Sequence, residues 1–253
     1  MKRLKNFFKK NLKVIIIFIV SMIITSMVSV YAAYNYLATD VSYTKPDGTG
    51  TSVKAALDEL YKKATIETVS QYLDCTGNYA DINDDGTVDG VIFIDLAKGA
   101  SGTGLNETYS YDVKQSGLKM YQLSTKKSSY TDSHFGTHAV ITQVGGSTGK
   151  DRFYVMALSD YSTSTYIWAN ACKLTKTVGS VTFRLPSKTE WAAFAGELGI
   201  TNSNYSSTYG LNNYYWTSTE DRSYGAWFTG FSTGGFGGNY GAGTYSARLC
   251  ATF

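Results

Sequence analysis

The chain has 253 residues, of which 43% are apolar and 15% aromatic, enough to bury a core and to exclude a wholly disordered chain. Its formal net charge of +3 comes from a basic N-terminus, where six of the Lys and Arg residues lie: Lys2, Arg3, Lys5, Lys9, Lys10 and Lys13. The rest carries 17 Lys and Arg (23 minus 6) against 20 Asp and Glu. No basic cluster remains on the folded part, so nucleic acid is not an expected partner.

The first 33 residues predict a membrane-targeting segment. Residues 1–13 are basic, and residues 14–33 are apolar apart from Ser, Thr and Tyr. About 20 such residues span a bilayer as a helix, and flanking Lys and Arg stay in the cytoplasm. We therefore expect a cytoplasmic segment 1–13 and a transmembrane signal anchor 14–33, with the rest displayed outside the cell. The alternative is a signal peptide cleaved after Ala32, which would make the protein secreted.

Residues 34–65 predict a stalk. Residues 35–50 form a tether that ends in the turn-forming sequence KPDG. A short amphipathic helix should follow, capped by Thr51 or Ser52. Its apolar residues recur with helical spacing at Val53, Ala56, Leu57, Leu60 and Tyr61. This face would pack on the following domain or, alternatively, mediate self-association.

From residue 66 to the end the pattern predicts one α+β domain. Buried strands are expected at 90–97, 137–144 and 152–158, separated by turns rich in Gly, Ser and Thr. One clear helix follows Ser187, a favourable N-cap residue. Trp191 and Phe194 lie on its apolar face, and Gly199 stands where a glycine ends a helix.

An acidic loop at 81–95 is a candidate for structural Ca²⁺. Oxygen-bearing residues alternate as in the first nine positions of an EF-hand loop, with Gly86 at the turn. The predicted ligands are Asp81, Asn83, Asp85, Asp89 and the carbonyl group of Thr87. The twelfth position is Ile92 rather than Glu, so Asp84 or Asp95 would have to complete the coordination. The alternative is an Asx-rich turn between strands.

The chain contains none of the common catalytic motifs. His134 and His138 are the only histidines, and their surroundings predict a loop that enters a strand rather than a metal-binding helix. Of the three cysteines, Cys172 and Cys250 could form a disulfide outside the cell, or all three could be buried thiols. We expect no enzymatic activity.

Three motifs occur in a familiar order in the C-terminal part: RLPSKTEW at 184–191, YWTSTE at 215–220 with AWF at 226–228, and ARLC at 247–250. Over residues 150–253 this order resembles the C-type-lectin-like domain of the formylglycine-generating-enzyme (sulfatase-modifying factor) superfamily. The resemblance implies twisted antiparallel strands, two helices and long loops. Catalytic members hold copper with a pair of cysteines, but here Cys250 alone lies beyond Cys172, so an oxidase is the least expected function.

The chain also resembles the variable proteins of diversity-generating retroelements, a branch of that fold with a hypervariable ligand-binding face. Adenine mutagenesis of AAC or AAT codons cannot produce Trp, and Trp227 is the single residue between positions 221 and 246 outside the reachable set. We expect a surface-displayed protein that binds an extracellular protein or glycan, the alternative being a structural cell-surface or appendage subunit. The predicted contacts are Arg222, Ser223, Tyr224, Phe228, Thr229, Ser232, Thr233, Phe236, Asn239, Tyr240, Thr244 and Tyr245.

Overall fold

The computed structural model describes residues 42–44, 50–52, 74–114, 116–221, 225–239 and 242–253. The chain divides into two compact units, residues 1–65 and 66–253, at the boundary where the sequence predicts the end of the stalk. In the first unit β1 (Ser42–Thr44) pairs antiparallel with β2 (Gly50–Ser52). The expected tether therefore contains a small β-ladder, and Thr51 and Ser52 belong to a strand.

Other N-terminal predictions fall on residues that are not described: the basic segment 1–13, the membrane segment 14–33 and the helix after Ser52. No helix in the described ranges is long and apolar enough to cross a membrane.

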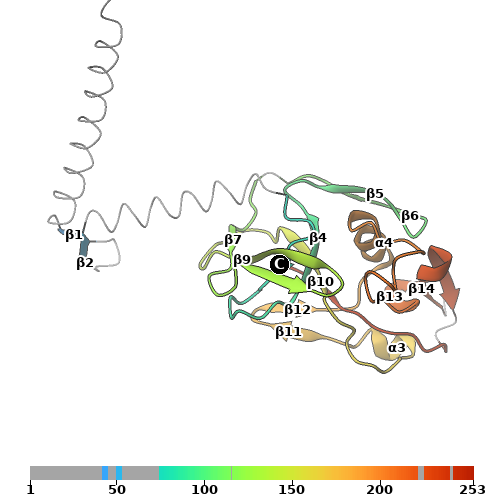
Figure 1. Cartoon of the computed structure of the whole chain (residues 1–253). Coiled ribbons are helices and arrows are strands. Elements are labelled where there is room, and N and C mark those ends of the chain that lie inside the picture. Colours follow the sequence, from blue (N-terminus) through green and yellow to red (C-terminus); the bar gives the residue numbers. More distant parts are fainter. Residues whose placement is uncertain (1–41, 45–49, 53–73, 115, 222–224, 240–241) are drawn as a thin grey trace, which may run out of the picture. The chain divides into compact units, whose positions relative to one another are not determined.

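The second unit is mostly β-sheet with few helices, which confirms the α+β class (Figure 1). Its main sheet has the order β16-β10-β4-β3-β9-β7, and β8 also pairs with β9. The strands are β3 (Tyr79–Ala80), β4 (Gly90–Asp95), β7 (Tyr121–Leu123), β8 (Ser129–Asp132), β9 (Gly136–Gln143), β10 (Phe153–Ala157) and β16 (Cys250–Thr252). The three strands predicted from the sequence correspond to β4, β9 and β10. The pairings in this sheet are antiparallel, as expected, except that of β3 with β9, which is parallel.

Three smaller sheets surround this one. They are β5 (Ala100–Gly104) with β6 (Glu107–Tyr111), β11 (Lys176–Val178) with β12 (Val181–Phe183), and β13 (Tyr214–Glu220) with β14 (Ala226–Gly230) and β15 (Gly235–Asn239). A one-turn helix, α3 (Trp168–Ala171), and a 3₁₀ turn, η1 (Phe231–Thr233), lie in the connections. Every pairing within these three sheets is antiparallel.

The predicted helix is α4 (Lys188–Glu197). Ser187 forms a capping box with Glu190: the Ser187 hydroxyl accepts the Glu190 N–H, and the Glu190 carboxylate accepts the Ser187 N–H. Gly199, at φ +67°, takes the left-handed conformation expected of a glycine that ends a helix. Figure 1 shows α4 between the β5–β6 hairpin and the β13–β14 pair.

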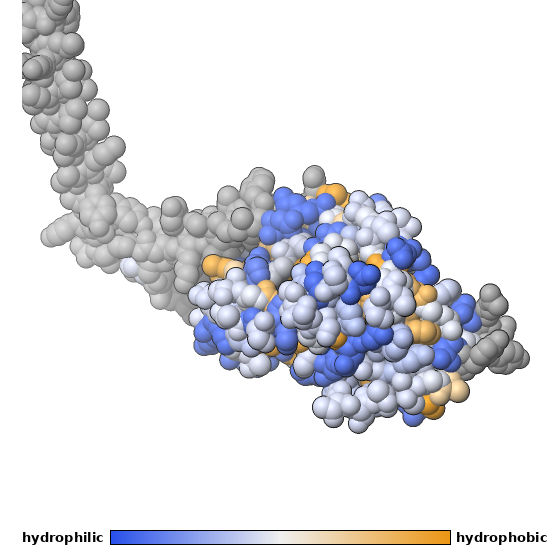
Figure 2. All heavy atoms as spheres, turned by 45° about the vertical axis from the view of Figure 1, so that its right-hand side comes forward, coloured by the Kyte–Doolittle hydropathy of each residue, from blue (hydrophilic) through white to orange (hydrophobic). Residues whose placement is uncertain are grey.

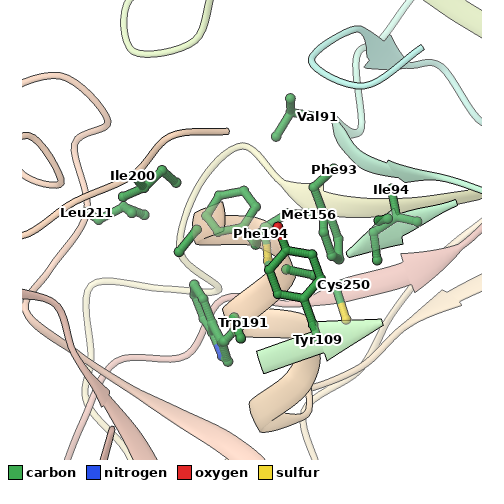
Figure 3. Packing of buried hydrophobic residues seen from close by; sticks show 14 of the residues in the cluster. Val91, Phe93, Ile94, Tyr109, Met156, Trp191, Phe194, Ile200, Leu211 and Cys250 are labelled. Atoms are coloured by element: carbon green, nitrogen blue, oxygen red, sulfur yellow. The ribbon is translucent and has the colours of Figure 1, made fainter. Parts of the chain in front are cut away.

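The main sheet buries both of its faces, because its strands alternate between two apolar clusters. Phe93 of β4 and Cys250 of β16 belong to the cluster that packs against α4, whereas Ile92 and Ala251 belong to the cluster on the other face. Figure 3 shows Trp191 and Phe194 of α4 in the first cluster, near Phe93 and Cys250. A strand buried on both sides needs a continuous apolar run, which explains the GVIFID sequence of β4.

Candidate ligand-binding face

Five aromatic side chains from four segments of the chain form two groups, Tyr161 with Tyr166 and Tyr214 with Phe228 and Tyr245, which the backbone bridge between Tyr166 and Tyr245 joins. We call them the aromatic face: Tyr161, Tyr166, Tyr214, Phe228 and Tyr245. Phe228 and Tyr245 have ring centroids 4.5 Å apart, and Tyr214 lies 5.3 Å from Tyr245 and 5.6 Å from Phe228. The exposed fractions of Tyr161 and Tyr214 are 44% and 41%, the other three rings being half-buried. The face therefore offers aromatic surface to a partner.

The aromatic face rests on Trp216, which is fully buried. The ring centroid of Trp216 lies 4.6 Å from that of Tyr245 and 6.2 Å from that of Phe228. Its indole N–H donates to the carbonyl oxygen of Tyr166 at 2.6 Å. The backbones of Tyr166 and Tyr245 also exchange two hydrogen bonds. A buried tryptophan thus fixes both the rings and the backbone of the face.

A partly buried polar network lies next to these tyrosines along the chain. Arg248 donates from Nε to Asp160 at 2.9 Å, and Asp160 also accepts the Tyr215 hydroxyl and the Asn212 amide. The Asn212 amide donates in addition to the Ser246 hydroxyl at 3.0 Å. Since Tyr161, Tyr214 and Tyr245 directly adjoin Asp160, Tyr215 and Ser246 in the sequence, the network holds the segments that present them.

Arg248 supplies the positive charge of this network, and its side chain is only 4% exposed. Its Nη1 has no hydrogen-bond partner among the described residues. A buried polar atom of this kind commonly binds an ordered water molecule. Arg248 is therefore a framework residue next to the face.

The predicted contact residues separate into distinct groups. Phe228 and Tyr245 belong to the aromatic face, Asn239 donates to the Tyr245 hydroxyl at 2.9 Å, and Thr244 is exposed nearby in sequence. Ser232 and Thr233 are exposed in η1. Four predicted contacts lie outside the described residues: Arg222, Ser223, Tyr224 and Tyr240.

Two predicted contacts need correction. Thr229 is buried, and its hydroxyl accepts the Tyr215 N–H at 2.9 Å, so it supports the sheet and is closed to a ligand. Phe236 pairs with Thr229 across the strands and therefore lies on the sheet face opposite Phe228. There the Lys188 ammonium group lies 5.3 Å from the Phe236 ring and 4.1 Å from the Trp227 ring. The prediction of a single binding face that includes both Phe228 and Phe236 is therefore wrong.

The contacts predicted from the sequence did not include three residues of the face: Tyr161, Tyr166 and Tyr214. The stretches DYSTSTY at 160–166 and NNYY at 212–215 have the same Tyr, Ser, Thr and Asn bias as the C-terminal stretch. That bias was the available signal. Figure 2 shows a surface of pale and hydrophilic residues with small scattered apolar patches, consistent with this composition.

The candidate calcium loop is closed by its own hydrogen bonds. Asp81 accepts the backbone N–H groups of Asp85 and Gly86, and Asp85 accepts the Thr87 N–H and the Asn83 amide. Asp89 accepts the Ile82 N–H, and burial raises its pKa. These are the bonds of an Asx-rich turn, in which carboxylates cap backbone donors instead of facing a common point.

The two residues expected to complete the coordination are also engaged elsewhere. Asp95 forms a buried bidentate ion pair with Arg152, and Asp84 accepts the hydroxyl groups of Ser124 and Thr125. Within the described ranges no three His, Cys, Asp or Glu side chains gather as a metal site. The arrangement does not fit Ca²⁺ as it stands, so calcium binding stays a prediction.

The cysteines match neither of the two predictions, a Cys172–Cys250 disulfide or three buried thiols, in full. Cys172 and Cys250 are separate thiols without a disulfide. Cys75 and Cys250 are buried, and burial raises the pKa of the Cys75 thiol to about 11. Cys172 is exposed at the end of α3, so the prediction of three buried thiols is wrong for this residue.

Comparison of the chain with protein-family models, with curated proteins and with solved structures gave no match.

Proposed function

We propose that this chain is a surface-displayed, non-enzymatic binding protein whose aromatic face contacts an extracellular protein or glycan. The observation that carries the proposal is the combination of exposed tyrosine rings with support that is fully buried at Trp216 and partly buried at the Arg248–Asp160 pair. Tyr161 and Tyr214 are accessible, whereas Trp216 and the Arg248–Asp160 network beneath them are held by hydrogen bonds.

The energetics of binding favour this arrangement. Association costs free energy for each side chain that loses rotamer freedom, so a pre-ordered contact surface binds more tightly than a mobile one. Tyrosine supplies a large amphipathic contact area with two χ angles, and Ser, Gly and Asn supply adaptable hydrogen bonds. The rings of Tyr214, Phe228 and Tyr245 already hold one another in edge and tilted contacts before any partner arrives.

The finer parts of the proposal rest on the sequence. The β-rich fold is consistent with a C-type-lectin-like domain, and the residue types between positions 221 and 246 agree with a retroelement-diversified site in which Trp227 is constant. The apolar segment 14–33 would carry the domain outside the cell as a signal anchor, or release it if cleaved. The partner is then extracellular, and the charge distribution does not favour nucleic acid.

A binding screen tests the proposal. The full chain, in detergent micelles, is applied to arrays of extracellular proteins and glycans, together with the variants Tyr214→Ala and Tyr161→Ala. Since exposed tyrosines at a binding face often contribute strongly, each substitution should weaken capture of a true ligand about tenfold or more, equivalent to a loss of about 1.4 kcal/mol. Leu123→Ala is the control, because Leu123 is 51% exposed on a strand outside the face.

Two outcomes would contradict the proposal. A ligand captured equally well by the wild type and both tyrosine variants would place binding elsewhere. If many natural variants of the chain capture no ligand, the alternative function as a structural cell-surface or appendage subunit is favoured.

Diversification has its own test at the nucleotide level. A near-copy of the codons for residues 216–248 that differs from them at adenines, close to a reverse-transcriptase gene, is the expected finding. A genome with neither element would remove this part of the proposal and leave a fixed binding face.

A further inference from the structure

A cavity of about 390 Å³ opens where three distant segments meet: the β5–β6 turn, the end of α4 and the η1 turn. Leu105, Ala195 and Ile200 form the buried apolar part of its lining. The volume lies within the range of about 300–1,000 Å³ found for small-molecule sites. None of the five residues of the aromatic face lines the cavity, so it is a separate feature of the domain.

The polar part of the lining is neutral. Asn106, Asn202 and Thr233 are exposed residues that line the cavity, and the described residues around it include no ionisable side chain. The amides of Asn106 and Asn202 make no hydrogen bond with another described residue. The Thr233 hydroxyl donates to the Gly230 carbonyl oxygen at 2.9 Å, which leaves its lone pairs as acceptors. The lining thus offers donors and acceptors without charge.

The β5–β6 turn, which carries the lining residues Leu105 and Asn106, has a strained backbone. Leu105 and Asn106 connect β5 to β6 with φ angles of +50° and +56°, values that favour Asn and Gly in a two-residue hairpin turn. A leucine in the left-handed region is unfavourable, and such outliers cluster at functional sites. Here the strained backbone places Leu105 in the apolar lining and Asn106 in the polar lining of the same cavity.

Close packing preforms the cavity. A Cβ atom at Gly104 would collide with the Ala192 carbonyl oxygen, and one at Gly196 would collide with the Tyr109 ring. The hairpin therefore lies directly on α4, and both glycines line the cavity at that contact. A preformed site costs little ordering entropy when a ligand enters.

We propose that this cavity binds a single uncharged sugar unit. Hydroxyl groups of a pyranose can pair with two amides and a threonine oxygen, while its C–H face contacts the exposed edges of Leu105 and Ile200. The absence of charge among the described lining residues argues against phosphates, carboxylates and peptide termini, each of which would lose hydration without an opposite charge. The proposal is independent of the proposed function of the aromatic face.

The test is ligand-observed NMR on the full chain in a detergent without a sugar headgroup. The probes are the methyl glycosides of glucose, galactose and N-acetylglucosamine, with N-acetylglutamine amide as the competing neutral amide. We expect saturable binding of at least one glycoside. The double variant Asn106→Gly, Asn202→Ala should weaken that binding at least tenfold, and glycine is chosen at 106 because it tolerates the positive φ.

Controls separate this proposal from the previous one. Asn170→Ala removes an exposed amide outside both the cavity and the aromatic face, and it should leave glycoside affinity unchanged. Circular dichroism melting confirms that each variant is folded. Three results would overturn the proposal: no glycoside binds, the double variant binds as tightly as the wild type, or the amide probe alone binds.

Discussion

Asp95 and Arg152 form the best buried of the ion pairs among the described residues, with side chains 0% and 4% exposed. Both contacts of the bidentate pair measure 2.7 Å, and Asp95 also accepts the backbone N–H groups of Cys75 and Ala97. Burial alone would lower the pKa of Arg152, but the carboxylate outweighs it and raises that pKa. Asp95 therefore holds the start of the domain against β10.

Removing the Asp95 carboxylate should lower the free energy of unfolding by about 3–5 kcal/mol, because it leaves a buried guanidinium group uncompensated. The comparison is Asp95→Ala against Asp151→Ala in urea titrations. Asp151 pairs with Lys119 at 34% and 21% side-chain exposure, so its loss should cost about 0–1 kcal/mol. Equal effects of the two substitutions would refute this account of the buried pair.

Glu190 is the second carboxylate on which the domain depends. Burial favours its neutral form, yet hydrogen bonds from Arg184 and Ser187 outweigh burial and lower its pKa below the ordinary value of 4.5. A carboxylate with a lowered pKa in the folded state contributes stability above its unfolded pKa. That contribution is lost as the pH falls through the folded pKa.

The stability difference between the wild type and Glu190→Gln should therefore shrink as the pH falls from about 6 to about 3. Urea unfolding at each pH measures it. Arg184→Gln should also flatten the pH dependence, because burial would then act on Glu190 with less opposition. A difference that stays constant over this range would show that Glu190 does not contribute through its charge.

At the scale of elements, the contact between α4 and the β5–β6 hairpin depends on the absence of a side chain at Gly104. A Cβ atom there would clash with the backbone of α4 at Ala192, which cannot move without disturbing the helix. The same contact forms one wall of the cavity.

Gly104→Ala should therefore destabilise the domain by about 1–3 kcal/mol through overpacking. Gly145→Ala is the matched control, since a Cβ atom at Gly145 would meet nothing within 4 Å. Its effect should stay within about 1 kcal/mol, because no atom obstructs the new Cβ and alanine restricts the unfolded chain. Thermal melting of both variants distinguishes the two cases, and an unchanged melting temperature for Gly104→Ala would contradict the packing argument.

At the scale of the whole molecule, the end of the chain closes the core. The Phe253 ring is fully buried, with its centroid 5.1 Å from that of Tyr121 and 6.2 Å from that of Phe153. The Phe253 carbonyl oxygen accepts the N–H groups of Arg152 and Phe153. The last strand thus pairs with the middle of the sequence, and the domain depends on contacts between residues far apart in the chain.

Phe253→Ala should cost about 3–5 kcal/mol, the usual loss for a buried phenylalanine. Leu123→Ala, at an exposed position, should change the free energy of unfolding by less than about 0.5 kcal/mol. Chemical denaturation measures both. A small effect at Phe253 would mean that the neighbouring apolar side chains can rearrange to fill the space that the phenylalanine ring leaves.

The sequence predicted elements where local signals were strong. The apolar runs identified β4, β9 and β10, and the Ser187 cap with Gly199 bounded α4. The calcium loop illustrates the limit: alternating oxygens are compatible with a metal site or with an Asx-rich turn, and the hydrogen bonds of Asp81 and Asp85 correspond to the turn. Sequence spacing does not say which donors a carboxylate will meet.

For this protein, the sequence by itself determined the α+β class, the main strands and the capped helix. The tertiary structure alone decided which aromatic residues share a surface. Adjacent strand residues point to opposite faces, so the pairing of β14 with β15 put Phe236 on the face opposite Phe228, whose ring contacts that of Tyr245. It also joined Tyr161 and Tyr214 to the face, because hydrogen bonds between distant segments carry no local signature in the sequence.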